Sequence, residues 1–248
     1  MRVFDTTIYF NELDVLEIRL HVLAPVVDTF VIVESDRTHL GAYKGHALAE
    51  HLDRFHDFRI QYHPESFGPL AEGESCWQRQ ARTRDLAAEY ANPEPDDLVL
   101  ISDVDEIPDP ALVARRAVGR YRQQMSYFWL NAICGVWTLG TVGVRGRDVR
   151  NGTADGLKYH QPLREHPNAG WHFGYMGGEE SVRAKLAAAV HTELGSAEQQ
   201  QIVVERRSAL RSVHGEPLEV VPITAERFPA WVVENQDRYS HLIRIANA

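Results

Sequence analysis

The chain has 248 residues, of which 44% are hydrophobic, and its 26 basic and 35 acidic residues give a net charge of -9. This length and apolar share allow one domain with a substantial core. The negative charge argues against nucleic acid or an anionic membrane surface as the main partner. Two cysteines, Cys76 and Cys134, offer little basis for a disulfide framework or a cysteine-based zinc site. No apolar run approaches the ~20 residues of a membrane helix, so we expect no integral membrane segment and a cytoplasmic location.

The first 120 residues alternate between strand patterns and helix patterns. β-Branched and aromatic residues predict strands at residues 3–10, 29–33, 58–63 and 98–101. Intervening residues predict helices at 11–22, 47–55, 77–90 and, opened by Pro108, up to about residue 121. This alternation predicts an α/β fold, with a mixed, mostly parallel sheet flanked by helices.

The second half of the chain is less regular. Aromatic and β-branched residues at 126–144, punctuated by glycines, predict antiparallel strands that complete the sheet. Helices are expected at 179–191 and 197–213, and the proline-bearing tail is expected to be an extended return segment. A loop at 67–75, rich in proline, glycine and glutamate, is expected to cover a site.

Two carboxylates, Asp103 and Asp105, follow the buried strand predicted at residues 98–101. Since like charges this close repel each other, a divalent cation is the simplest explanation for them. Mg²⁺ and Mn²⁺ take oxygen ligands and commonly share them between carboxylates and substrate phosphates. The alternative is that these acids only cap the helix opened by Pro108, for which one acid suffices.

Residues 170–178 are rich in glycine, and two acids, Glu179 and Glu180, open the helix that follows. Glycines let the backbone approach a ligand, and a carboxylate in such a setting is suited to take a proton from a hydroxyl group. We therefore expect a catalytic base here and prefer Glu180 to Glu179. The alternative is a favourable charge in the first turn of a helix.

Cationic side chains on two predicted helices are candidates for binding phosphate oxygens. Arg79 and Arg84 lie on the helix at 77–90, and Arg183 and Lys185 lie on the helix that begins at Glu179. Arginine can grip a phosphate in a bidentate way that an acidic chain otherwise lacks. Salt bridges on a solvated face are the alternative for all four.

Histidines and strand ends supply the remaining candidates. His172 and His191 are candidate third metal ligands because imidazole binds Mn²⁺, although a single histidine is more often a structural residue. Asn11, Glu12 and Glu34 lie at the predicted ends of the first two strands, where a doubly wound sheet binds a nucleotide. Asn11 and Glu12 alternatively cap the first helix.

Four segments carry a resemblance to a known family: FNELDVLEIRL at 10–20, VDTFVIVES at 27–35, ISDVDEIP at 101–108, and GWH at 170–172 continuing to 185–186. In them the chain resembles the family 17 glycosyltransferases, which include the enzyme that adds bisecting N-acetylglucosamine to N-glycans. The resemblance implies a GT-A fold, an inverting reaction and a UDP-sugar donor, which is UDP-N-acetylglucosamine for characterised members. It also implies a divalent metal, usually Mn²⁺ and otherwise Mg²⁺.

By this resemblance, Asp103 and Asp105 hold the metal and the nucleotide, and Glu180 stands where inverting GT-A enzymes often place their base. We expect one domain, with a nucleotide-binding half at 1–125 and an acceptor-binding half at 126–248. Trp171 and Tyr175 are the expected acceptor-binding residues.

The chain departs from animal members of the family, which have a membrane anchor and a stem. We therefore expect a saccharide or small-molecule glycoside as acceptor, and the oligomeric state is left open. Two other classes remain: a nucleotidyltransferase acting on sugar phosphates, which would release pyrophosphate, and a non-catalytic saccharide-binding module.

Overall fold

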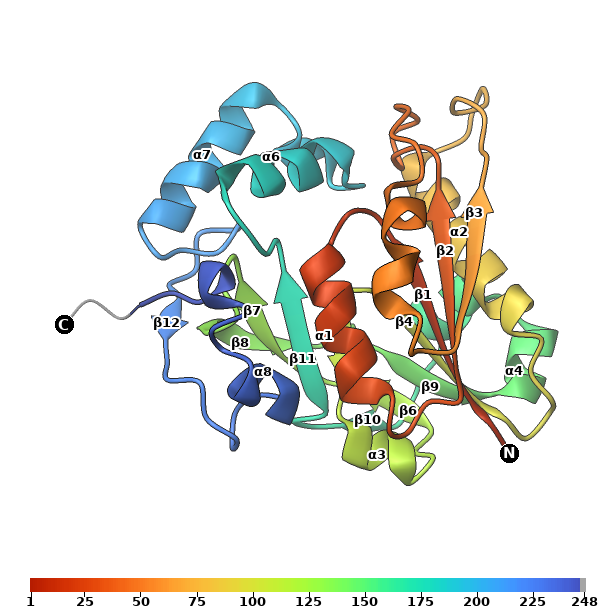
Figure 1. The fold of residues 1–248 in the computed structure, drawn as a ribbon. Coiled ribbons are helices and arrows are strands. Elements are labelled where there is room, and N and C mark those ends of the chain that lie inside the picture. The colour runs from red at the N-terminus through yellow and green to blue at the C-terminus, as the bar shows by residue number, and fades with distance from the viewer. Residues whose placement is uncertain (246–248) are drawn as a thin grey trace.

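The computed structural model describes residues 1–245, whose strands form two sheets (Figure 1). Within this range the larger sheet has seven strands, in the order β10 (Glu165–His166), β6 (Gly119–Tyr121), β9 (Val142–Arg145), β4 (Leu98–Asp103), β1 (Val3–Tyr9), β2 (Thr29–Ser35) and β3 (Ile60–Glu65). The four strands from β4 to β3 are parallel, and β9 runs antiparallel to β4 and β6. This is the mixed, mostly parallel sheet of an α/β fold, consistent with the GT-A-like architecture.

The second sheet lies next to the carboxyl end of β4, because β5, one of its strands, follows β4 almost directly. In the described residues it has five strands, in the order β12 (Glu219–Val220), β8 (Ala132–Trp137), β7 (Gln123–Tyr127), β11 (Gly170–Gly174) and β5 (Glu106–Pro108). Only Val104 and Asp105 separate the end of β4 from the start of β5. The carboxylate motif therefore lies at the junction of the two sheets.

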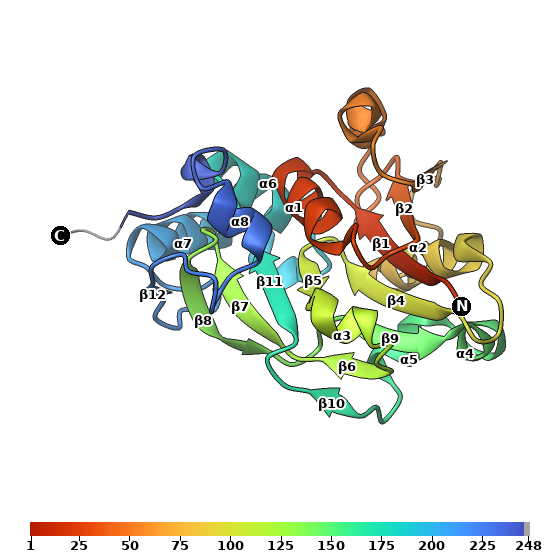
Figure 2. The ribbon, with the colours of Figure 1, turned by 60° about the horizontal axis from the view of Figure 1, so that its bottom comes forward.

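The helices of the described range pack around both sheets. They are α1 (Leu13–Leu23), the 3₁₀ helix η1 (Ala47–Phe55), α2 (Cys76–Ala91), α3 (Pro110–Ala114), α4 (Gly146–Asn151), α5 (Ala154–Tyr159), α6 (Glu179–Ala188), η2 (Thr192–Leu194), α7 (Ala197–Ser208), α8 (Ala230–Glu234) and η3 (Ser240–Leu242). Figure 2 shows α1 beside β1 and α3 beside β6, where β10, β6 and β9 extend the sheet beyond β4. None of the helices in the described range is long and apolar enough to cross a bilayer.

The alternation of side chains along the strands explains why helices pack on both faces. Phe4 and Val31 form an apolar cluster with Ala91 of α2. Phe30 and Ile32, which alternate with Val31, instead join the core built around α1. That core also contains residues of β5, β11 and α8, so α1 links the two sheets.

Most elements predicted in the first 105 residues are confirmed, with shifts of a few residues at their ends. The helix predicted from Pro108 to about residue 121 is wrong, because α3 ends at Ala114 and β6 follows. The chain turns between them at Arg116, which has a positive φ of 56°, and β6 begins at Gly119, with φ 137°. A Cβ at Gly119 would stand 2.3 Å from the carbonyl oxygen of Arg164, so the backbone packs too closely there for any other residue.

The second half differs more from the prediction. β7 and β8 pair in antiparallel fashion as expected, but in the second sheet, and β9 alone joins the first. The helices α4 and α5 were not predicted. The expected extended return segment is wrong, because the C-terminal segment contains α8 and η3. The acceptor-binding half was expected at 126–248, and its last three residues lie outside the described range.

Candidate active site

A cavity of about 600 Å³ opens at the carboxyl edge of the parallel strands β1, β2 and β4. Residues at or just after the ends of these strands form one wall, including Phe10, Arg37 and Asp103. Residues of β7, β11 and α6 form the facing wall. Its volume lies within the ~300–1,000 Å³ of small-molecule and cofactor sites. The cavity therefore has the size of a small-molecule or cofactor site.

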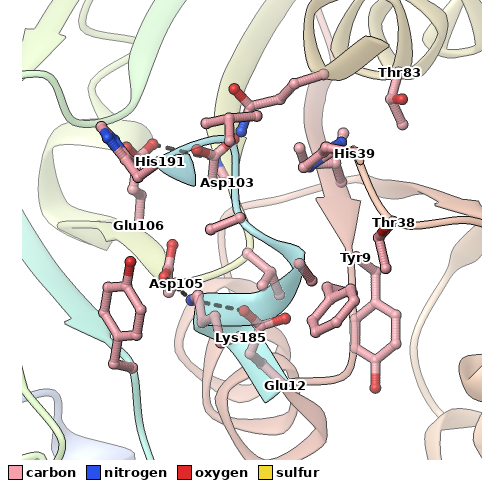
Figure 3. Close-up of a pocket in the computed structure, with 18 of the residues that line it drawn as sticks. Tyr9, Glu12, Thr38, His39, Thr83, Asp103, Asp105, Glu106, Lys185 and His191 are labelled. Carbon is pink, nitrogen blue, oxygen red and sulfur yellow. Dashed lines mark hydrogen bonds and ion pairs between the residues drawn. The ribbon is translucent and has the colours of Figure 1, made fainter. Parts of the chain in front are cut away.

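Asp105 lies in this cavity and shares one cation with Glu12. The ammonium group of Lys185, on α6, stands 2.7 Å from Asp105 Oδ2 and 2.7 Å from Glu12 Oε1 (Figure 3). His172 Nε2 lies 3.4 Å from the same Asp105 oxygen. Burial raises the pKa of Asp105, but Lys185 and His172 lower it by more. The pKa of this carboxyl group is therefore held well below its usual range, and the group stays charged.

Asp103 is held in the same manner by a buried arginine. The Arg84 side chain is 1% exposed, and its Nη2 donates to Asp103 Oδ1 at 2.8 Å. Arg84 also pairs with Asp155, at the start of α5. Although burial raises the pKa of Asp103, Arg84 and Lys158 lower it below its ordinary value. Arg84 thus holds Asp103 in place from behind the cavity wall.

The turn that carries the motif is fixed by two further buried cations. Arg19 of α1 pairs with Asp5 in β1 and donates to the carbonyl oxygens of Asp103, Val104 and Glu106, at 3.2, 3.3 and 2.7 Å. The sequence analysis missed Arg19, although an acid in the middle of a buried strand signals a buried partner.

Glu106 is a structural acid that faces the second of these cations. Its carboxylate pairs with Lys158 of α5 and accepts from the Trp137 indole at 2.9 Å. The Lys158 side chain is fully buried. No local sequence signal connects Lys158 to Glu106, because they are 52 residues apart and α5 itself was not predicted.

These contacts decide how well the site fits a divalent metal. Among residues 1–245, no three histidine, cysteine, aspartate or glutamate side chains form a group that could hold a metal ion. One oxygen of Asp103 is bound by Arg84, and Lys185 occupies the space between Asp105 and Glu12. A dication on Asp105 would face the ammonium group at close range, which Coulomb repulsion disfavours. The donor set as arranged does not fit a preformed Mn²⁺ or Mg²⁺ site.

The two histidines expected as metal ligands both line the cavity but do not join each other at the carboxylates. His172 contacts Asp105, whereas His191 pairs with Glu193 at 2.9 Å and is half exposed. A third histidine, His39, was not singled out in the sequence. It also lines the cavity, and its Nδ1 is a buried atom without a hydrogen-bond partner in the described residues. Burial lowers the pKa of His39 to about 4, so it is neutral at physiological pH.

The first turn of α6 does not reach the cavity. Glu179 and Glu180 are exposed, and Glu179 pairs with Arg183 at 2.8 Å along the same helix. Among the described lining residues, α6 contributes Lys185 and Ala188. The phosphate-binding role expected for Arg183 is therefore not supported, because its guanidinium group already donates to Glu179 and Gln201. The base role of Glu180 or Glu179 stays a prediction, without a place in this cavity.

Arg79, expected to bind phosphate, instead makes contacts that stabilise the fold. Arg79 donates to the carbonyl oxygens of Gly68 and Pro69 and pairs with Glu74, so it fastens the loop at 67–75. Neither Arg79 nor this loop is among the described lining residues. The Arg79 side chain is 4% exposed, which leaves it unable to meet a nucleotide, and the expected covering role of the loop is likewise not supported.

Glu34 also has a structural role rather than the expected nucleotide-binding one. Its buried carboxylate accepts from the backbone amides of Ala47 and Leu48, from Tyr62 and from Lys44. These four donors occupy both oxygens and cap the start of η1. Asn11 is exposed and lies outside the described lining residues, whereas its neighbour Glu12 lines the cavity.

The two expected acceptor-binding aromatics lie in different surroundings, Trp171 within β11 and Tyr175 directly after it. Tyr175 lines the cavity, and Lys185 Nζ lies 5.3 Å from its ring centroid. Trp171 donates to the carbonyl oxygen of Arg227 at 2.7 Å and packs against the core around α1. Trp171 therefore has a structural role in the described residues, and Tyr175 remains a candidate for binding the acceptor.

Residues 1–119 match the family model described as glycosyltransferase family 17. The match covers just under half of the 248 residues and includes β1, β2, β4 and the motif at their edge. No curated protein matches the chain. His172 and Lys185, on the facing wall, lie beyond the matched segment, so their roles depend on the geometry of the cavity.

Proposed function

Because the chain belongs to glycosyltransferase family 17 and is a glycosyltransferase, we propose that it moves a sugar from a UDP-sugar to a hydroxyl group of a saccharide or small-molecule glycoside. N-Acetylglucosamine is the sugar we propose, since it is the one that the resemblance of the chain implies. A cytoplasmic location stays a prediction.

One observation carries the choice of donor. The cavity opens at the carboxyl edge of β1, β2 and β4, where open α/β sheets bind nucleotides. Its wall combines aromatic rings, among them Tyr9 and Phe10, with the cationic side chains of Arg37, Lys44 and Lys185. Rings suit a nucleobase or a sugar face, and cations suit a diphosphate. A nucleoside diphosphate sugar supplies all of these groups in one molecule.

The proposed reaction is a single displacement at the anomeric carbon of the donor. The acceptor oxygen forms a bond to this carbon from the face opposite the nucleotide. The bond from the carbon to the β-phosphate oxygen breaks, and its electron pair leaves with UDP. The hydroxyl proton passes to a base, so the products are an inverted glycoside, UDP and a proton. Charge that develops on the departing diphosphate requires a positive group beside it.

The experiment that tests this function is a screen for nucleotide release. UDP-, GDP- and TDP-sugars would each be mixed with the protein and a panel of saccharides and glycosides, with Mn²⁺ or with EDTA, and free nucleotide would be measured. We expect UDP release from UDP-N-acetylglucosamine above the protein-free rate. Pyrophosphate release from a nucleoside triphosphate would instead indicate the nucleotidyltransferase class, and saccharide binding without any UDP release would indicate a non-catalytic module.

Manganese dependence stays a prediction of the sequence. The carboxylates that would hold the ion, Asp103 and Asp105, are each paired with a cationic side chain. No step of the proposed reaction is therefore assigned to a metal. UDP release in Mn²⁺ compared with that in EDTA tests whether the reaction depends on the metal.

A further inference from the structure

We propose that Lys185 takes the place of a divalent metal, as the built-in cation that binds the donor diphosphate and stabilises it as it departs. This inference rests on the proposed UDP-sugar donor. It starts from the position of Lys185, whose ammonium group lies between Asp105 and Glu12 at the cavity wall (Figure 3).

The two acids position Lys185 with little freedom. Its Nζ contacts one carboxylate oxygen from the turn between β4 and β5 and one from the residue before α1, both at 2.7 Å. The Tyr175 ring lies on a further side, with its centroid 5.3 Å from Nζ. The Lys185 side chain is nonetheless 21% exposed and lines the cavity. An ammonium group has three N–H donors, and two carboxylates leave one for a phosphate oxygen.

The same contacts leave the motif without capacity for a dication. Asp105 and Glu12 would be the natural oxygen ligands on this side of the cavity, and the single ammonium group of Lys185 already bridges the two carboxylates. Asp103, on the other side, is paired with the buried guanidinium of Arg84. Two cationic side chains, Lys185 and Arg84, thus supply part of the positive charge that a metal would provide.

The chemical step needs only a fixed positive charge. When the bond to the anomeric carbon breaks, negative charge increases on the β-phosphate, and the Lys185 ammonium group stabilises it through a charge-assisted hydrogen bond. Lys185 keeps its proton throughout, so the proton balance of the transfer is unchanged.

Calorimetric titration with UDP tests the inference directly. The wild type should bind UDP in EDTA with an affinity within ~3-fold of that in Mn²⁺. The Lys185→Met variant should bind UDP ~10- to 100-fold more weakly in EDTA, the usual effect of losing a hydrogen bond to a charged group. Lys185→Arg, which keeps the charge, should lose less. Arg183→Met is the matched control, since Arg183 lies on the same helix but outside the described cavity lining, and should bind as the wild type does.

A second readout follows Mn²⁺ itself by electron paramagnetic resonance. Lys185→Met frees Asp105 and Glu12 from their shared cation, and His172 lies beside Asp105, so this variant should bind Mn²⁺ more tightly than the wild type does. Thermal melting checks that each variant is folded. If Lys185→Met does not fold, wild-type UDP binding in EDTA compared with that in Mn²⁺ still tests the inference.

Several results would overturn the inference. One is wild-type UDP binding that requires Mn²⁺, and another is wild-type-like binding by a folded Lys185→Met protein in EDTA. UDP release from UDP-sugars only in the presence of Mn²⁺ would reject the role of Lys185 but leave the proposed function intact. Absence of both UDP binding and UDP release, with and without metal, would reject the proposed function and this inference together.

Discussion

Arg19 donates to the carbonyl oxygens of the turn between β4 and β5 while pairing with Asp5 in the buried sheet. Both side chains are 0% exposed. Replacing Arg19 with methionine would leave Asp5 as a buried charge without a partner, which typically costs ~3–5 kcal/mol of stability. Urea unfolding of the Arg19→Met protein should show a loss of this size, along with weaker UDP binding, because the carbonyl oxygens around the motif lose their donor.

The double variant separates the charge effect from the loss of packing. Asp5→Asn combined with Arg19→Met removes the stranded charge, so it should be more stable than Arg19→Met alone. If the two changes were simply additive in a double-mutant cycle, the ion pair would not explain the stability of this part of the core.

His39 should make stability depend on pH. Burial lowers its pKa from 6.5 to about 4 in the folded state, so between these values only the unfolded chain binds the proton. Stability therefore falls as pH drops below about 6.5, by ~2 kcal/mol at pH 5 relative to pH 8. His39→Gln removes this term, so its unfolding free energy should decline less over the same range. Parallel pH profiles for the two proteins would contradict the assignment.

At the scale of elements, Glu34 joins β2, η1 and β3 through four donors. Glu34→Gln removes the charge that these donors share, and we expect a loss of ~2–3 kcal/mol in the free energy of unfolding. Glu50→Gln, an exposed change in the same 3₁₀ helix, is the matched control and should change stability by under ~0.5 kcal/mol. Unchanged stability with loss of UDP binding would instead restore a nucleotide-binding role for Glu34.

Glu34 also shows where prediction from sequence fails. Asp103 and Asp105 could be located because a local signal, a buried apolar run followed at once by acids, marks the edge of the sheet. The role of Glu34 could not, because Ala47 and Tyr62, which use up its carboxylate, come from elements that no local pattern connects to it. Lys158 was missed for the same reason, since it reaches Glu106 from α5 across 52 residues.

Helix and strand patterns failed in a similar way after Pro108. The composition of residues 108–121 favours a helix, but tertiary packing at Gly119 requires a positive φ and close backbone contact. Parallel strands with continuous apolar runs were predictable, because their pattern follows from burial on both faces. Partners of buried charges and the assignment of strands to a second sheet depend on contacts distant in sequence.

At the scale of the whole molecule, the C-terminal segment closes the core that α1 shares between the two sheets. Tyr239 is fully buried, and its hydroxyl donates to Glu17 of α1 at 3.0 Å. Arg238 pairs with the same carboxylate at 2.6 Å, and Trp231 donates to the Tyr239 hydroxyl at 2.9 Å. Because Val232 of α8 belongs to the same core, the segment is part of the folding unit rather than a tail laid on its surface.

Tyr239→Ala should therefore destabilise the entire described structure and not only its last residues. Removing a large buried ring typically costs ~3–5 kcal/mol, whereas Tyr239→Phe, the matched control, removes only hydroxyl contacts and should cost ~1 kcal/mol. Unfolding followed by far-ultraviolet circular dichroism and by tryptophan fluorescence should give one shared transition in both variants, shifted to lower urea in the alanine protein. A separate early transition, with protease cleavage confined to the segment after Pro229, would mean that α1 and the two sheets hold together without it.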